Sequence, residues 1–368
     1  MIGKSIGIYI HVPFCAKKCP YCDFYSTSYK KNTADSYIDA VIRNINAYSN
    51  KELNVDTIYF GGGTPSLLSG NKYRQVIDEI KGNFDYSSDC EVTIEVNPST
   101  VNEQKLCEYS EAGINRISVG VQSMIDSELK LLGRLHNSGK VKETLETAIK
   151  AGFKNISCDL MIGLPNQKKE DVEYSISEIT DYPITHVSSY ILKIEDGTEF
   201  SRKGMSKQIP DDDCVSELYL HMCSQLEKRG FKQYEISNFS KEGYQSRHNL
   251  KYWQCDDYLG IGSAAHSCFG GKRFAVDADL QSFVSDEKQS TYITEETPYT
   301  FEEKAMLRLR LSDGLEISDC PEEKRKFILK KIPMLEKNGY IVFNEKKIAL
   351  TSKGFLMSNS IIEYLIFE

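Results

Sequence analysis

The sequence predicts an α/β fold in which six β/α units form a partial barrel of parallel strands. Strand-like and helix-like segments alternate through the first two hundred residues, and the strand-like segments are short and rich in β-branched or aromatic residues. Such alternation is typical of a parallel sheet covered by helices. Six units rather than eight would leave the barrel open on one side. The predicted strands cover residues 8–12, 57–60, 92–96, 116–119, 156–160 and 187–191.

The segments between these strands have helical periodicity. In the clearest one, Val141, Leu145 and Ile149 recur at i, i+4 and i+8. Ser138 is the expected N-cap of this helix, and Gly152 follows it as a stop. The same order of helix, glycine and strand occurs at two other joins in the chain.

The pattern changes after residue 200, which divides the chain into three predicted parts. We expect the partial barrel in residues 1–200, an extension of it in residues 201–290, and a C-terminal helical domain in residues 291–368. Residues 203–213 are expected to form a polar link, and the boundary before the last part is expected in the polar, irregular segment 276–300.

The predicted C-terminal domain has the element order of a winged helix. Helices are expected over residues 302–311 and 322–338, followed by a hairpin over 341–350 and a final helix. This part of the chain lacks a strong basic excess, which argues against DNA binding.

Composition indicates a cytoplasmic protein. The chain has 368 residues, of which 40% are hydrophobic and 27% charged, enough for one large core and a smaller domain. It has neither a continuous apolar stretch long enough to span a bilayer nor the cleavable apolar core of a signal peptide. A net charge of -8 argues against a nucleic-acid partner. Peripheral membrane association and a homodimer remain open.

Three closely spaced cysteines, Cys15, Cys19 and Cys22, follow the first predicted strand. Such a loop can ligate three irons of a [4Fe–4S] cluster and leave the fourth iron open to a reactant. The alternative is a structural zinc site with a fourth ligand from elsewhere. The other eight of the 11 cysteines are scattered singly, so neither a second zinc-ligand pair nor a disulfide framework is evident.

Polar residues follow or end the next four predicted strands. The glycine-rich run Gly61-Gly62-Gly63-Thr64-Pro65 follows the second strand, Glu95 and Asp159 end the third and fifth, and Gln122 follows the fourth. Each alone would fit a solvated strand end or a tight turn. Because the carboxyl ends of parallel strands meet at one rim, we expect all of them to face a common site. Arg134 could supply a cation there, although a surface salt bridge is the default interpretation.

The cysteine loop and the glycine run together resemble the radical S-adenosylmethionine (SAM) enzymes. Further motifs make the chain similar to oxygen-independent coproporphyrinogen III oxidase and its relatives, and this similarity covers essentially the whole chain. These motifs are Tyr9-Ile-His11-Val-Pro13-Phe-Cys15, Glu95-Val-Asn97-Pro98, Ser118-Val-Gly120-Val-Gln122-Ser123, Gly133-Arg134-Leu-His136 and Asp159-Leu-Met-Ile-Gly163-Leu-Pro165. By this resemblance, SAM on the cluster would be bound by Tyr9, Tyr21, Gly62 and Glu95. Positions that hold a second SAM in the oxidase correspond to Gly63, Thr64, Gln122, Arg134 and Asp159, and His266 resembles a residue whose main chain touches SAM.

Two departures distinguish the chain from the oxidase. Phe24 stands where the oxidase has a further cysteine, and the oxidase's longer N-terminal extension is missing. The segment His248-Asn249-Leu-Lys-Tyr252-Trp253 is instead the mark of the HemW family of heme chaperones. An imidazole there could ligate heme iron while aromatic rings cover the porphyrin. From the residues alone, a packed tryptophan beside a hydrogen-bonded histidine is the favoured interpretation.

The resemblance therefore implies a heme chaperone with a [4Fe–4S] cluster on Cys15, Cys19 and Cys22, a SAM site, and a heme site at His248, Asn249, Tyr252 and Trp253. Its partners would be heme and the recipient hemoproteins. The alternatives are a radical SAM enzyme that oxidatively decarboxylates coproporphyrinogen III, and a radical SAM enzyme that methylates or opens heme.

Overall fold

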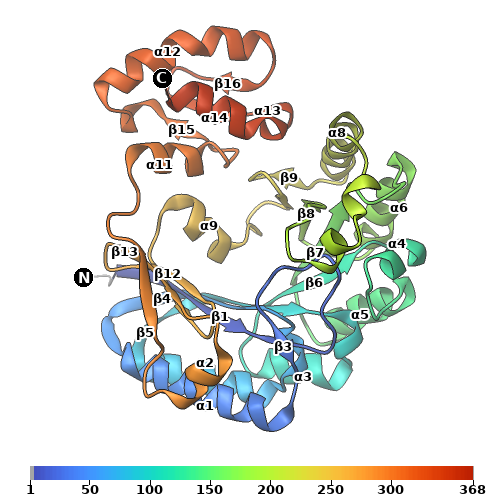
Figure 1. The fold of residues 1–368 in the computed structure, drawn as a ribbon, viewed down its shortest axis with the longest axis vertical. Coiled ribbons are helices and arrows are strands. Elements are labelled where there is room, and N and C mark those ends of the chain that lie inside the picture. The colour runs from blue at the N-terminus through green and yellow to red at the C-terminus, as the bar shows by residue number, and fades with distance from the viewer. Residues whose placement is uncertain (1–3, 368) are drawn as a thin grey trace.

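The computed structural model describes residues 4–367 and has one large mixed sheet wrapped by helices (Figure 1). All six predicted strands are present, and each pairs in parallel with the next. The predicted partial barrel is thus confirmed. Its strands are β1 (Lys4–Val12), β4 (Asn50–Gly62), β5 (Phe84–Val96), β6 (Arg116–Gln122), β7 (Asn155–Ile162) and β8 (His186–Ile191).

The sheet continues beyond both edges of this partial barrel. A seventh parallel strand, β11 (Tyr258–Ile261), pairs with the other side of β1. Beyond it lie three antiparallel strands, β12 (His266–Phe269), β13 (Lys272–Val276) and β14 (Thr291–Glu295). At the opposite edge, β10 (Asn238–Ser240) pairs antiparallel with β8 and is followed by β9 (Lys232–Gln233).

The prediction that residues 276–300 are irregular was wrong, because this segment contains both a helix and a strand. α10 (Leu280–Ser285) packs on α1 (Lys31–Ala47), and β14 closes the edge of the sheet. The strand escaped notice because its large side chains, Tyr292 and Ile293, are exposed, so it lacks a buried apolar face.

Helices cover the outer face of the sheet (Figure 1). Besides α1 and α10 these are α2 (Gly70–Asn83), α3 (Glu103–Glu111), α4 (Asp126–Leu131), α5 (Ser138–Lys150), α6 (Lys169–Thr180) and α8 (Asp212–Lys228). The prediction of Ser138 as the N-cap of α5 was off by one residue. Asn137 is the cap, since its side chain accepts from the Lys140 N–H at 2.9 Å.

Shorter elements connect these layers. They are β2 (Phe14–Cys15), β3 (Thr27–Ser28), the 3₁₀ turns Pro65–Leu67, Pro98–Thr100, Met205–Lys207 and Ile317–Asp319, and the helices α7 (Glu199–Arg202) and α9 (Arg247–Gln254). Among residues 4–367, no helix combines the length and apolar character that crossing a bilayer requires.

The tail after residue 300 contains the predicted helices and hairpin in the predicted order, with an additional strand, β15, after the first helix and two helices in place of one at the end. It consists of α11 (Phe301–Arg308), β15 (Leu315–Glu316), α12 (Glu322–Lys337), β16 (Ile341–Phe343), β17 (Lys347–Leu350), α13 (Ser352–Leu356) and α14 (Ser358–Ile366). Its strands form a separate sheet in the order β15-β17-β16. In Figure 1 the helices α11 to α14 lie above the barrel, where α11 packs on α9 and α13 packs on α8.

The two faces of the partial barrel differ in polarity. Alternate residues of each strand, such as Ile8, Ile58 and Ile94, are buried under the helices and form the apolar core. The residues between them face the interior of the barrel, where Glu95 and Asp159 line a cavity. Because polar side chains rarely form a hydrophobic core, this polar interior indicates a binding site.

Candidate functional site

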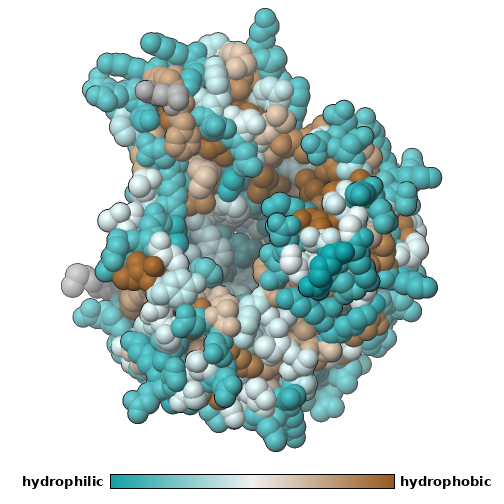
Figure 2. Space-filling model, in the orientation of Figure 1, coloured by the Kyte–Doolittle hydropathy of each residue, from teal (hydrophilic) through white to brown (hydrophobic). Residues whose placement is uncertain are grey.

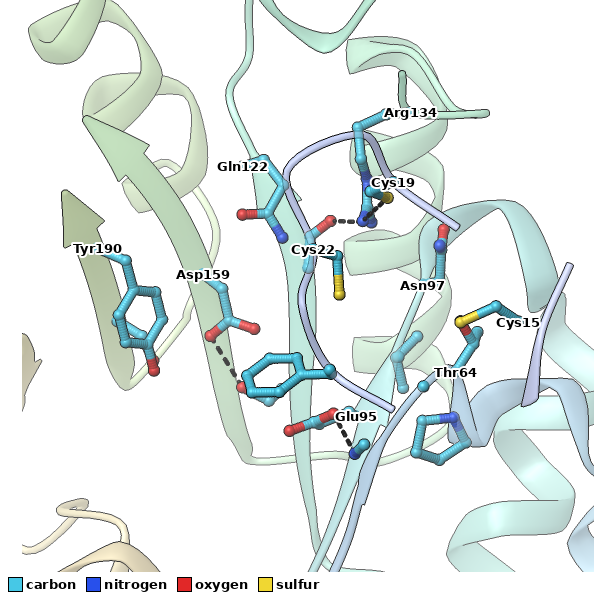
Figure 3. A pocket seen from close by; sticks show the side chains of 18 of the residues that line it. Cys15, Cys19, Cys22, Thr64, Glu95, Asn97, Gln122, Arg134, Asp159 and Tyr190 are labelled. Carbon is cyan, nitrogen blue, oxygen red and sulfur yellow. Dashed lines mark hydrogen bonds between the residues drawn. The ribbon is translucent and has the colours of Figure 1, made fainter. Parts of the chain in front are cut away.

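A cavity of about 390 Å³ lies at the carboxyl ends of the parallel strands. Figure 3 shows side chains from five successive strand ends and from the cysteine loop pointing into it. The sequence-based expectation of a shared rim agrees with this arrangement. Of the predicted site residues, those that line the cavity are Cys15, Cys19, Tyr21, Cys22, Gly62, Gly63, Thr64, Glu95, Gln122, Arg134, Asp159 and Asn249.

The three loop cysteines are half-buried at this cavity, and none is in a disulfide. The Thr64 hydroxyl points at Cys15 Sγ over 3.6 Å, and Arg134 Nη1 points at Cys19 Sγ over 3.7 Å. Donors aimed at sulfur suit thiolate ligands. Among residues 4–367, no three potential ligands converge closely enough for a single metal ion. Since each cysteine of a cuboidal cluster binds a different iron, the loop fits a cluster better than zinc.

The glycine run is held against the cysteine loop by main-chain hydrogen bonds. The Gly63 N–H donates to the Val12 carbonyl at 2.8 Å, and the Thr64 N–H donates to the Phe14 carbonyl at 2.7 Å. Gly62 has φ of +109°, and a Cβ there would lie 2.7 Å from the His11 ring. Glycine is therefore required at this position, because any larger residue would be strained and would clash.

Glu95 lies beside this run. Its carboxylate accepts from the Tyr59 hydroxyl at 3.0 Å and from the Gly62 N–H at 3.2 Å. Burial, followed by repulsion from Asp159, raises the pKa of Glu95 to about 7. A carboxyl poised near neutral pH would ionise readily beside a cationic ligand.

Three other predicted residues, Arg134, Gln122 and Asp159, also line the cavity. Arg134 Nη2 donates to the Gly120 carbonyl at 2.9 Å, and Gln122, at the end of β6, has φ of +69°. Asp159 accepts from the Ser118 hydroxyl at 2.9 Å, and burial raises the pKa of Asp159. Asp159 lies within β7 rather than at its end, because the strand continues to Ile162.

Two predicted SAM contacts are absent from the lining of this cavity in the described chain. The Tyr9 hydroxyl is 3.1 Å from His11 Nδ1, and its ring lies 6.2 Å from that of Tyr59. His266 begins β12 and has an exposed side chain. Their contacts with SAM stay a prediction.

The prediction of His248 as a heme contact disagrees with the geometry. The side chain is fully buried, with Nδ1 2.9 Å from the Thr57 hydroxyl and Nε2 2.8 Å from the Tyr252 hydroxyl. Burial, followed by the charges of Lys251 and Arg116, lowers the pKa of His248 to about 3. With both ring nitrogens engaged in the core, His248 fixes α9 to β4 and has no free atom for iron.

The other three residues predicted to contact heme also differ in whether they reach the cavity. Asn249 lines the cavity, whereas Tyr252 is engaged with His248 and Trp253 is half-buried away from the lining. Several further residues on the strands or directly after them line the cavity but were not assigned to the site from the sequence. These are Tyr59, Asn97, Arg116, Ser118, Ser188 and Tyr190. The alternation of inward-facing and outward-facing residues along the strands could have revealed them, because each shares a face with, or lies beside, a predicted site residue.

Comparison with known proteins agrees with this architecture. Residues 9–179 match the family model of the radical SAM superfamily. The heme chaperone HemW of Haemophilus influenzae is 33% identical to this chain over 99% of it and 98% of the relative. The chaperone of the same name from Bacillus subtilis is 35% identical over 98% of this chain and 99% of that one.

The chain belongs to the HemW family of heme chaperones. Among solved structures, coproporphyrinogen III oxidase (HemN) from Escherichia coli, a radical SAM enzyme, superposes with a TM-score of 0.83 at 20% identity, covering all of this chain and 91% of the other. This chain and the oxidase therefore share a fold. The departure at Phe24, which is 64% exposed beside the cysteine loop, lies at the mouth of the cavity.

Proposed function

We propose that this HemW-family chain is a cytoplasmic heme chaperone that carries a [4Fe–4S] cluster, binds SAM, and holds heme for delivery to recipient hemoproteins. The observation that carries the proposal is the meeting of Cys15, Cys19 and Cys22 with Gly62 and Glu95 at one cavity. Full-length similarity to heme chaperones supports the heme part of the proposal.

Each of these residues would have a separate task. Cys15, Cys19 and Cys22 would ligate the cluster, which when bound supplies an open iron position for SAM and an electron. Gly62 and Gly63 would present main-chain groups to the methionyl end of SAM, since glycines allow close approach. Glu95 would balance the positive charge of SAM. Thr64 and Arg134 would orient the cysteine sulfurs through the contacts described above.

The heme would lie nearer the mouth of the cavity than the buried His248. Tyr190 and Ile191 of β8 are 45% and 42% exposed, and Leu220 of α8 is 39% exposed. Figure 2 shows apolar side chains gathered over β8 and α8 beside the hollow between barrel and C-terminal segment. A flat apolar macrocycle is suited to such a surface.

The proposal is tested on anaerobically reconstituted full-length protein. We expect iron and sulfide in equal amounts, an EPR signal of a reduced cluster that changes when SAM is added, and transfer of heme from the loaded protein to an apo-hemoprotein. Absence of iron would contradict the cluster, and absence of transfer would contradict the chaperone role. Decarboxylation of coproporphyrinogen III by the same sample would favour the enzyme alternative.

A further inference from the structure

A second hollow, an open groove of about 600 Å³, lies on the Arg134 side of the cysteine loop. It is bounded by that loop and by the turn that joins α4 to α5. Its lining includes Lys17, Lys130, Arg134, Leu135 and Lys140. The function proposed above gives no task to this groove.

Arg134 connects this groove to the cysteine loop. The guanidinium lines both the groove and the cavity, and its Nη1 points at Cys19 Sγ over 3.7 Å. A narrow recess lined by Lys17, Cys19 and Arg134 continues the groove toward that sulfur. In Figure 3, Arg134 and Cys19 lie across the cavity from Tyr190, beside which heme is proposed to lie. The groove therefore approaches the cysteine loop from a side that the proposed heme surface leaves free.

The turn after α4 presents an apolar side chain at this groove. The Gly133 N–H donates to the Lys130 carbonyl at 3.1 Å. Gly133 has φ of +67°, and a Cβ there would lie 2.7 Å from the Pro20 ring, so the turn packs directly on the cysteine loop. Leu135 follows with its side chain 55% exposed. An exposed apolar side chain on a fixed turn, surrounded by charged groups, has the arrangement of a protein-binding surface.

The charge of the groove is opposite to that of the whole chain, which is -8. Among residues 4–367, the exposed side chains of Lys17 and Lys130 are not in an ion pair, whereas Lys140 pairs with Glu143 at 2.6 Å. Asp126 is the only carboxylate in the described lining, and it already accepts a main-chain N–H at 2.8 Å. An acidic protein would thus be attracted to this groove and repelled by the net charge of the rest of the surface.

The neighbouring cysteine loop indicates what kind of acidic protein this would be. Reduction of an iron–sulfur cluster takes up one electron and neither forms nor breaks a covalent bond, so a donor has only to bind close to the sulfurs. The recess that leads to Cys19 makes the groove a short route to them. Electron-transfer complexes have small, weak interfaces, and complementary charges steer the encounter of their partners. A groove with one exposed leucine and two unpaired lysines matches that description.

We propose that Lys17, Lys130 and Leu135 form the docking surface of an acidic protein that carries one electron to the cluster. The inference rests on the proposed function, because it presupposes a cluster on the cysteine loop. In the complex the carrier is oxidised by one electron and the cluster is reduced by one electron, and no proton or leaving group is transferred.

The test uses the reconstituted full-length protein with two acidic one-electron carriers, reduced flavodoxin and reduced plant-type ferredoxin. Titration measures the affinity of each complex, and EPR and visible absorbance measure the rate of cluster reduction. We expect Lys130→Glu and Leu135→Asp each to weaken binding of at least one carrier by at least about tenfold and to slow reduction by that carrier to a similar degree. Binding to the wild type should weaken as salt is raised from about 50 to about 300 mM.

Two controls separate docking from a change in the cluster. Dithionite is a small reductant that needs no docking surface, and it should reduce both variants at the wild-type rate and to the same midpoint potential. Lys154→Glu makes the same charge change at an exposed position just before β7, at the opposite end of the barrel, and should retain wild-type affinity and rate. Lys130→Gln should give an intermediate loss, and it provides the same comparison if the glutamate variant does not fold.

Three results would overturn the inference. They are unchanged affinity and reduction rate in both variants, failure of the wild type to bind either carrier, and equal slowing of reduction by carrier and by dithionite. If the reconstituted wild type contains no iron, the proposed function itself fails. That outcome is distinct, because metal analysis involves no carrier.

Discussion

His248 Nε2 lies 2.8 Å from the hydroxyl of Tyr252, one helical turn later in α9, while Nδ1 lies 2.9 Å from Thr57. The ring is thereby held between α9 and β4. Arg247 and His248 also donate their main-chain N–H groups to the carboxylate of Glu91, both at 3.2 Å. Through these contacts, His248 anchors α9 to the sheet.

We therefore predict that His248→Ala lowers stability and leaves heme affinity unchanged. The variant loses a buried ring and leaves two hydroxyls without a partner, which together cost about 3 to 5 kcal/mol in the free energy of unfolding. Urea unfolding and heme titration measure the two effects. Tyr252→Phe is the milder control, expected to cost about 1 to 3 kcal/mol. Loss of heme binding by a stably folded His248 variant would restore the original assignment of this residue.

The second prediction concerns the cysteine loop. Cys15→Ala, Cys19→Ala and Cys22→Ala should each abolish retention of the cluster, because a missing thiolate leaves a second iron without a protein ligand. Iron and sulfide analysis after anaerobic reconstitution measures this loss. Cys214→Ala is the control, since Cys214 is exposed on α8 and should be dispensable. Stoichiometric zinc in place of iron would contradict the prediction.

The third prediction concerns the glycine run. Gly62→Ala should weaken SAM binding by at least about tenfold, because a Cβ displaces His11 and strains a main chain that only glycine adopts easily. Equilibrium dialysis with labelled SAM measures the affinity. Gly82→Ala is a matched control, because a Cβ there meets nothing within 4 Å, and in helix α2 it should stabilise the protein by about 0.5 to 1 kcal/mol. Equal SAM affinity of both variants would exclude a role for the Gly62 backbone.

The fourth prediction follows from the raised pKa of Glu95, which moves from 4.5 to about 7. A carboxyl with a raised pKa stabilises the fold below its unfolded pKa, and this contribution is lost as pH rises through the folded pKa. The ligand-free wild type should thus lose up to about 3 kcal/mol relative to Glu95→Gln between about pH 4.5 and 7. Chemical unfolding at about pH 5 and about pH 8 measures the difference. A constant gap between the two proteins would contradict the prediction.

Much of the fold could be predicted because the parallel strands carry a buried apolar face that is visible as β-branched runs. The strands β11 to β14 could not be predicted in this way. β11 is short and contains Gly260, and β14 exposes its large side chains. β11 pairs with β1, which is distant in the sequence, and β14 pairs antiparallel with β13. Sequence periodicity reveals neither pairing.

The site was predictable to the extent that it depends on strand ends. Glu95, Gln122 and Asp159 reach one cavity because parallel strands end at one rim. His248 was misjudged because its partner Thr57 lies 191 residues away, and no local pattern reveals that contact. Arg116 was overlooked because a charged residue opening a strand looks like a surface residue until its burial is known.

The pairing of β11 with β1 also affects how the protein folds during its synthesis on the ribosome. One edge of β1 is complete only when Tyr258–Ile261 has been synthesised, long after the cysteine loop has emerged. Until then the strand that leads into the loop presents open main-chain groups to other chains, a recognised route to aggregation. Iron loading is therefore expected to follow translation of the barrel, and truncation before residue 258 should yield a chain that aggregates instead of acquiring metal.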